Sequence, residues 1–211
     1  MSIDLEAVTR AIKYGISEYD HSHLGQVWLK PVTILMVDEL VPSIRLPKPK
    51  PYLWANSMGR TPWRKHVFSS LRNVGRYKHE CMVDVHVTQG DEDPYRTVLT
   101  AESEGYSGHA ALLGKSTDND LMWDLLKLLL LPSPIRLFVS LSSEKYHSTL
   151  LESTAEMVRK YADADSVRAT DDVWAIQFPT GSLDKRSVLV ARWGPGRHKR
   201  APERADVMSR G

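Results

Sequence analysis

Two short segments of alternating hydrophobicity constrain the fold of this chain more than any other feature. Residues 81–87 have the sequence CMVDVHV and residues 98–104 the sequence VLTAESE, and both alternate with the two-residue period of a β-strand. The intervening residues 88–94, TQGDEDP, are dense in turn formers. The pattern therefore predicts neighbouring strands joined as a hairpin or meander.

A helix and a further strand follow this pair. Residues 118–131, DNDLMWDLLKLLLL, begin at a good N-cap residue and end before Pro132, and their apolar content predicts a nearly buried helix with Trp123 in the core. Residues 135–141, IRLFVSL, are typical of a short buried strand. The strand, helix, strand order predicts a crossover within one sheet.

The other periodic segments complete the predicted architecture. Residues 3–19 and 143–162 have the spacing of amphipathic helices, and residues 173–178 and 187–193 resemble strands. We therefore expect one α/β domain over residues 1–193, with a mixed central β-sheet flanked by helices.

Three further segments are set apart by proline or charge. Residues 27–41 are rich in β-branched side chains but contain Pro31, which favours an edge strand or a broken element. Residues 45–53 hold three prolines with basic spacers, which predicts an extended surface arm, with the basic region continuing to about residue 78. Residues 194–211 are predicted to form a basic, flexible tail.

Composition narrows the class of protein. Cys81 is the single cysteine, so no disulfide can form within the chain, and the first residues lack the profile of a secretory signal. The longest apolar run, residues 125–131, is far shorter than the roughly 20 residues that cross a bilayer. We expect a cytoplasmic protein without a membrane-spanning helix.

Positive charge is concentrated in one region. The formal net charge is only +2, yet residues 41–79 contain nine Lys or Arg residues and no Asp or Glu, with Tyr52, Trp54 and Trp63 interleaved. Such a face can neutralise phosphates and release their counterions, which predicts DNA as a partner. The alternative is a solvated surface or arm. The candidate nucleic-acid contacts are Arg60, Arg64, Lys65, Arg72, Arg76 and Lys78.

Negative charge is concentrated on the predicted strand pair. Asp84 shares a strand face with His86, and Glu102 and Glu104 share a face of the second strand. Three converging carboxylates repel one another unless a cation lies among them, and a hard Mg²⁺ or Mn²⁺ ion suits oxygen ligands. Such an ion can promote phosphodiester hydrolysis. The alternative is a solvent-facing amphipathic strand, with His86 in a cross-strand hydrogen bond rather than at a phosphate.

These residues resemble a known family. Asp84, followed after 17 residues by Glu102-Ser103-Glu104, a helix and the strand IRLFVSL, resembles the core of the PD-(D/E)XK nuclease superfamily over residues 77–141. The narrower likeness is to the branch in which glutamate replaces the motif lysine, as in BamHI-type restriction endonucleases. The resemblance implies a restriction-endonuclease-like core in which Asp84 and Glu102 hold the metal and Glu104 orients or deprotonates the attacking water.

The sequence also departs from the family pattern. Val83 stands where the family has proline, and the motif lysine is absent. Lys127 from the following helix, or Lys115 from the preceding loop, could supply the missing positive charge. Glu18 is the candidate for the acidic residue that some members carry on the first helix.

The predicted function is a metal-dependent DNA endonuclease, restriction-type in the narrower reading. Because cutting both strands commonly needs two active sites, we also expect a homodimer. One alternative is a non-catalytic DNA-binding protein on the same scaffold. Another is an NTP-binding protein that uses residues 108–116, which approach a P-loop but have one residue too many between the glycines.

Overall fold

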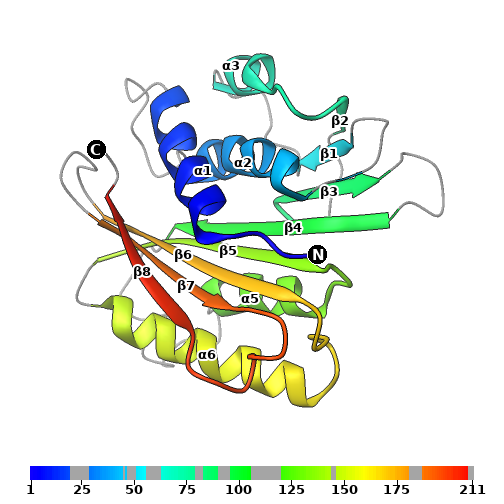
Figure 1. Ribbon diagram of the computed structural model, residues 1–211. Coiled ribbons are helices and arrows are strands. Elements are labelled where there is room, and N and C mark those ends of the chain that lie inside the picture. Colours follow the sequence, from blue (N-terminus) through cyan, green and yellow to red (C-terminus); the bar gives the residue numbers. More distant parts are fainter. Residues whose placement is uncertain are drawn as a thin grey trace.

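A single eight-stranded sheet runs through the part of the chain that is described. The computed structural model describes residues 1–19, 29–44, 46, 51–55, 63–78, 83–89, 96–105, 120–143, 146–180 and 187–208. The strand order is β2-β1-β3-β4-β5-β6-β7-β8. Helices α1 and α2 cover one face of the sheet, and α5 and α6 cover the other (Figure 1). The predicted mixed sheet flanked by helices is confirmed.

The helices are α1 (Leu5–Glu18), α2 (Leu29–Leu40), α3 (Trp63–Ser70), α5 (Asp120–Leu130) and α6 (His147–Asp163), with the short 3₁₀-helix η2 (Val41–Ile44). The strands are β1 (Tyr52–Ala55), β2 (Arg76–Lys78), β3 (Val85–Gln89), β4 (Arg96–Gly105), β5 (Ile135–Ser142), β6 (Asp172–Pro179), β7 (Ser187–Trp193) and β8 (Glu203–Met208).

The predicted hairpin and crossover are both present. Strands β3 and β4 are antiparallel, with Val85 opposite Ala101. Strand β5 then pairs in parallel with β4 after the α5 crossover, and β6 pairs in parallel with β5 after α6. The end of β4 therefore lies at the same edge as the ends of β5 and β6, because carboxyl ends of parallel strands coincide.

Helices α1 and α2 pack closely on one face. Asp4 caps α1 by accepting a hydrogen bond of 2.7 Å from the Ala7 N–H. Gly15 lies where the helices touch, since a Cβ there would come within 2.9 Å of the Val32 carbonyl oxygen. This close approach explains why a glycine occupies the middle of a helix, where it is intrinsically unfavourable.

The prediction of an edge strand over residues 27–41 is wrong, because this segment contains α2. Pro31 lies in the first turn of the helix, where the backbone N–H groups have no intrahelical partner, so proline costs little. All residues of α2 except Lys30 and Glu39 are buried. A helix buried on nearly all sides has no amphipathic period that would distinguish it from a strand.

The predicted arm and tail also belong partly to the fold. The basic region of residues 45–78 contains β1, α3 and β2 rather than an extended arm, and Gly75 N–H donates to the Pro51 carbonyl at 2.8 Å. Residues 194–208 do not form a flexible tail, because β8 pairs with β7 and Val207 is buried. Charged residues suit β8, since charge on an edge strand discourages further strand pairing.

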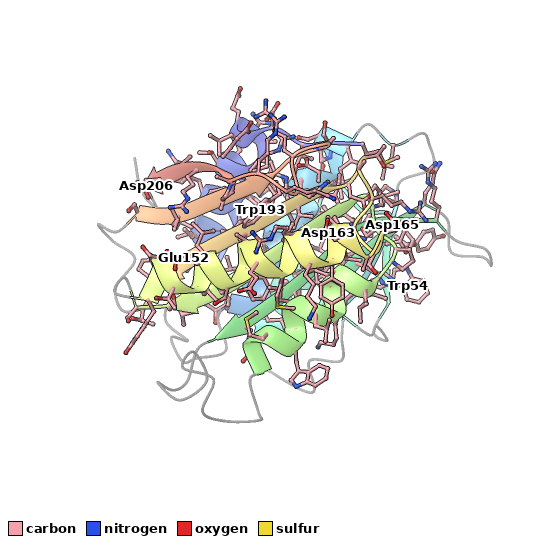
Figure 2. The ribbon with its side chains drawn as sticks, turned by 90° about the horizontal axis from the view of Figure 1, so that it is seen from below. Trp54, Glu152, Asp163, Asp165, Trp193 and Asp206 are labelled. Carbon is pink, nitrogen blue, oxygen red and sulfur yellow. The ribbon has the colours of Figure 1, made fainter. Side chains whose placement is uncertain are left out.

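A second apolar cluster lies between the sheet and helices α5 and α6. It includes Trp193 of β7, which lies behind α6 in Figure 2. Trp174 is also buried, but Trp123 is 57% exposed, so its predicted core position is wrong. The reason is that α5 turns only one stripe toward the sheet, namely Leu125, Leu128 and Leu129.

Arg136 connects α5 to the face of the sheet that α5 and α6 cover. Its side chain is 1% exposed and forms a 2.5 Å ion pair with Asp171. It also donates to the carbonyls of Leu128 and Leu131, at the carboxyl end of α5. In the part of the chain that the structure describes, no helix is both long and apolar enough to cross a membrane.

Candidate functional site

Asp84 and Glu102 are neighbours where β3 begins and β4 ends, but their carboxylates extend to opposite faces of the sheet. Asp84 immediately precedes β3, and its backbone N–H donates to Glu102 Oε2 at 3.1 Å. Both side chains are largely withdrawn from solvent, Asp84 being 9% and Glu102 1% exposed. The antiparallel pairing of β3 and β4 places the Asp84 backbone beside Glu102, whereas the predicted convergence of the carboxylates is not seen among the described contacts.

Each oxygen of Asp84 has its own partner. Oδ1 accepts from Lys30 Nζ at 2.5 Å, and Lys30 belongs to the first turn of α2. Oδ2 accepts from both the backbone N–H and the hydroxyl of Ser103, at 3.0 and 2.6 Å. Asp84 is thus held in one orientation by groups from α2 and from β4.

Glu102 points to the opposite side of the sheet, toward α5. Its Oε1 lies 3.1 Å from Lys127 Nζ, and Lys127 also forms an ion pair with Asp124. Burial, together with the negative charge of Asp84, raises the pKa of Glu102 to about 7, although Lys127 opposes the shift. Burial works against the charged lysine, but contacts with Asp124 and Glu102 raise the pKa of Lys127, so it stays protonated.

Glu104 follows two residues later on the same face of β4. It is half-buried and lies beside Ser140 of β5, which in turn lies beside Gln177 of β6. Ser140 Oγ and both amide atoms of Gln177 are buried without a hydrogen-bond partner among the described residues. Buried polar groups are normally hydrogen-bonded, so these atoms are able to form hydrogen bonds with water or a ligand.

The donor set is compatible with a hard divalent cation. Mg²⁺ is commonly held by one or two carboxylates together with substrate phosphates. Asp84 and Glu102 can provide carboxylates. The high proton affinity of Glu102 arises first from its burial and then from the charge of Asp84. Among the described residues no three His, Cys, Asp or Glu side chains gather as a metal site, so the predicted trio of carboxylates is not formed there.

The predicted nucleic-acid contacts are spread over the region next to this pair. Arg64 and Lys65 lie in α3, and Arg76 and Lys78 lie in β2, the edge strand of the sheet. Arg60 lies outside the described residues, as do Lys115 and residues 108–116 of the P-loop-like segment.

Three other candidates make local contacts. Arg72 is 3.4 Å from Glu18 and lies over the Tyr14 ring, so both Arg72 and Glu18 take part in attaching the segment after α3 to α1. His86 meets the Trp54 ring edge-on at a centroid distance of 5.5 Å. Burial lowers the pKa of His86 to about 4, so this side chain is neutral at physiological pH.

Sequence reasoning missed Lys30 and Ser103 as members of the site. Lys30 lies 54 positions before Asp84, and its segment resembled a strand, so nothing in the local pattern placed it there. Ser103 was visible between the two glutamates, but its hydroxyl faces Asp84 only because the strands pair as they do.

No family model, curated protein or solved structure matches this chain.

The raised pKa of Glu102 predicts a pH-dependent difference in stability between the wild type and Glu102→Gln. The folded protein binds this proton up to a pH of about 7 and the unfolded chain only up to about 4.5, so the wild type loses stability as pH rises through that window. His86 acts in the opposite direction between pH 4 and 6.5, but equally in both proteins.

We expect the stability of Glu102→Gln relative to the wild type to increase by about 3 kcal/mol between pH 4.5 and pH 8. Urea denaturation in EDTA across this range measures it. A difference between the two proteins that does not change with pH would contradict the environment described for Glu102.

Proposed function

We propose that this protein is a metal-dependent DNA endonuclease, and that its active site is formed by Asp84 and Glu102. The observation that carries the proposal is the hydrogen bond from the Asp84 backbone N–H to the Glu102 carboxylate, where β3 begins and β4 ends, with a lysine beside each carboxylate. The order of a three-strand antiparallel unit, a crossover helix and a parallel strand also agrees with the likeness to the PD-(D/E)XK superfamily. A restriction-type activity remains the narrower form of the proposal.

The residues around the pair have separable roles in this proposal. A bound Mg²⁺ or Mn²⁺ ion would supply a polarised phosphate and a more acidic water. Asp84 and Glu102 would hold that ion, and Ser103 orients Asp84 by two hydrogen bonds. Glu104 would orient or deprotonate the attacking water.

Lys127 offers the positive charge that the motif itself lacks. It reaches Glu102 from α5, stays protonated, and is 45% exposed at the side chain, so it can also reach a substrate phosphate. Since phosphodiester cleavage develops negative charge on the phosphate, a fixed cation there lowers the barrier. Lys30 provides a second cation, beside Asp84.

The basic strands and helix suit a nucleic-acid surface beside this pair. Strands β2 and β1 lie next to β3 in the sheet, so the acid-free region of residues 41–79 adjoins the strand that follows Asp84. We propose that this region holds flanking phosphates. Action as a homodimer and a location in the cytoplasm stay predictions.

A supercoiled plasmid incubated with the protein tests the proposal. We expect nicking or linearisation with Mg²⁺ or Mn²⁺ and none with EDTA. Intact plasmid in every metal, using protein with a cooperative unfolding transition, would contradict it.

One observation favours a non-catalytic DNA-binding protein instead. Both carboxylates already have lysine partners, so their charge can be balanced without a metal ion. This alternative predicts that DNA binding is salt-dependent, is unchanged by EDTA, and is not accompanied by cleavage.

A further inference from the structure

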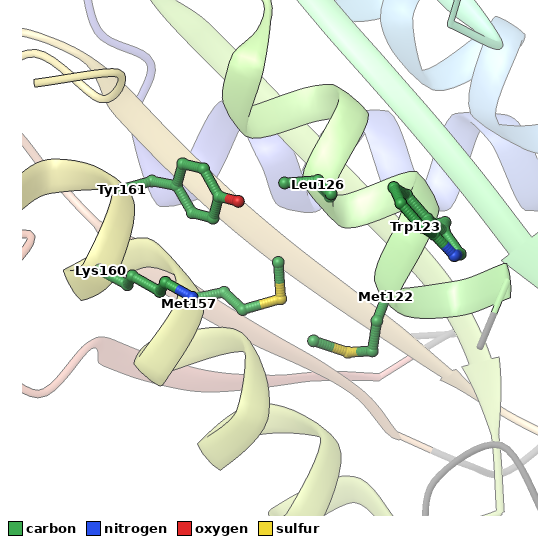
Figure 3. Close-up of a pocket in the computed structure, with 6 residues that line it drawn as sticks. All are labelled: Met122, Trp123, Leu126, Met157, Lys160 and Tyr161. Carbon is green, nitrogen blue, oxygen red and sulfur yellow. The ribbon is translucent and has the colours of Figure 1, made fainter. Parts of the chain in front are cut away.

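A recess between α5 and α6 is not part of the candidate site around Asp84 and Glu102. Its lining residues are Met122, Trp123, Leu126, Met157, Lys160 and Tyr161, and its volume is about 280 Å³ (Figure 3). Five of the six are apolar or aromatic, and the one charge is positive. A volume of this size is close to the lower end of the range for small-ligand pockets.

Trp123 is the most unusual of these residues. Its side chain is 57% exposed, on a helix whose other face is fully buried. Figure 3 shows Tyr161 and Met157 on α6 facing the α5 side of the recess. Exposed aromatic rings of this kind form stacking platforms for unpaired bases, worth about 1–3 kcal/mol per base.

The recess adjoins the candidate active site through α5. Trp123 and Lys127 are four residues apart and therefore lie on the same side of the helix. Lys127 is the residue that contacts Glu102. A nucleotide whose base lies against Trp123 can place a neighbouring phosphate at Lys127, and Lys160 offers a second cation beside the base.

We infer that the recess binds one unpaired nucleobase, so that the substrate is DNA with a single-stranded or displaced nucleotide. The inference rests on the proposed function for its link to cleavage. Bases inside an intact duplex are stacked on both faces and cannot enter such a recess without being flipped out.

The test compares binding of a fluorescent oligothymidylate with that of a blunt duplex of equal length, in EDTA so that metal-dependent cleavage is prevented. Trp123→Ala is expected to weaken oligothymidylate binding about tenfold and to change duplex binding less than about twofold. Trp123→Tyr should retain most of the affinity, because it keeps an aromatic face. The matched control is Leu130→Ala, which removes an equally exposed side chain of α5 outside the recess and should change neither.

Unchanged oligothymidylate binding by Trp123→Ala would overturn the inference, as would an equal loss for both DNA forms. Dissociation of a dimer by Trp123→Ala, seen by sedimentation with DNA binding intact, would assign the face to self-association instead. The endonuclease proposal fails separately. If the wild type shows the Trp123-dependent preference but never cleaves DNA, the base site is supported and the endonuclease proposal fails. If it cleaves DNA without that preference, the endonuclease proposal is supported and the base site fails.

Discussion

Replacing Glu102 with glutamine is expected to reduce Mg²⁺-dependent DNA cleavage at least about a hundredfold, because several kcal/mol of metal-derived stabilisation depends on its charge. Glutamine keeps the size of the side chain and can still accept the hydrogen bond from the Asp84 N–H. It cannot supply the negative charge that a hard divalent cation requires of its ligands. Plasmid cleavage at saturating Mg²⁺ and pH 8 measures the loss.

The matched control is Glu152→Gln, on the outer side of α6, where the glutamate is exposed. It should cleave at the wild-type rate. A cooperative urea unfolding transition of Glu102→Gln at pH 8 would show that misfolding does not explain its inactivity, and removal of the buried charge favours the variant at that pH. Cleavage by Glu102→Gln within about threefold of the wild type would contradict a role as a metal ligand.

Arg136→Met is expected to destabilise the protein by about 3–5 kcal/mol, the usual cost of removing one partner of a buried ion pair. Asp171 would remain buried without the guanidinium, and the carbonyls of Leu128 and Leu131 would lose their donor. Since those carbonyls end the helix that carries Lys127, the change also loosens the attachment of α5 next to Glu102. Urea denaturation at neutral pH gives the free energy of unfolding.

Arg10→Met provides the comparison for this prediction. Arg10 forms an exposed ion pair with Glu6 four residues earlier on α1, and such pairs contribute only about 0.3–0.5 kcal/mol. If Arg136→Met lowers the free energy of unfolding by less than about 1 kcal/mol, the ion pair between Arg136 and Asp171 does not stabilise the fold as the geometry indicates.

The elements that sequence predicted well are those with a clear local period. Apolar and polar residues alternate along both strands of the β3–β4 hairpin. Helices α5 and α6 carry apolar stripes that are visible within a short stretch of sequence. Because strand pairing follows from alternation, the closeness of the Asp84 backbone to Glu102 was within reach of sequence alone, but the opposite directions of the two carboxylates were not.

The elements that sequence missed depend on distant packing. Helix α2 is buried on nearly every side and so lacks the amphipathic pattern, while β8 is polar because it is an edge strand. Lys30 enters the site only because α2 packs across β3 and β4. The burial of Arg136 within the strand predicted over residues 135–141 depends on Asp171, 35 positions away.

Binding of Mn²⁺ in solution, followed by electron paramagnetic resonance, tests most directly whether Asp84 and Glu102 hold a divalent ion. We expect the free-ion signal to fall when wild-type protein is added at pH 8, and this fall to be nearly absent at pH 5.5, where Glu102 is protonated because its pKa is about 7. Asp84→Asn and Glu102→Gln should bind little at either pH. Absence of binding by the wild type at pH 8, or equal binding by both variants, would contradict the account.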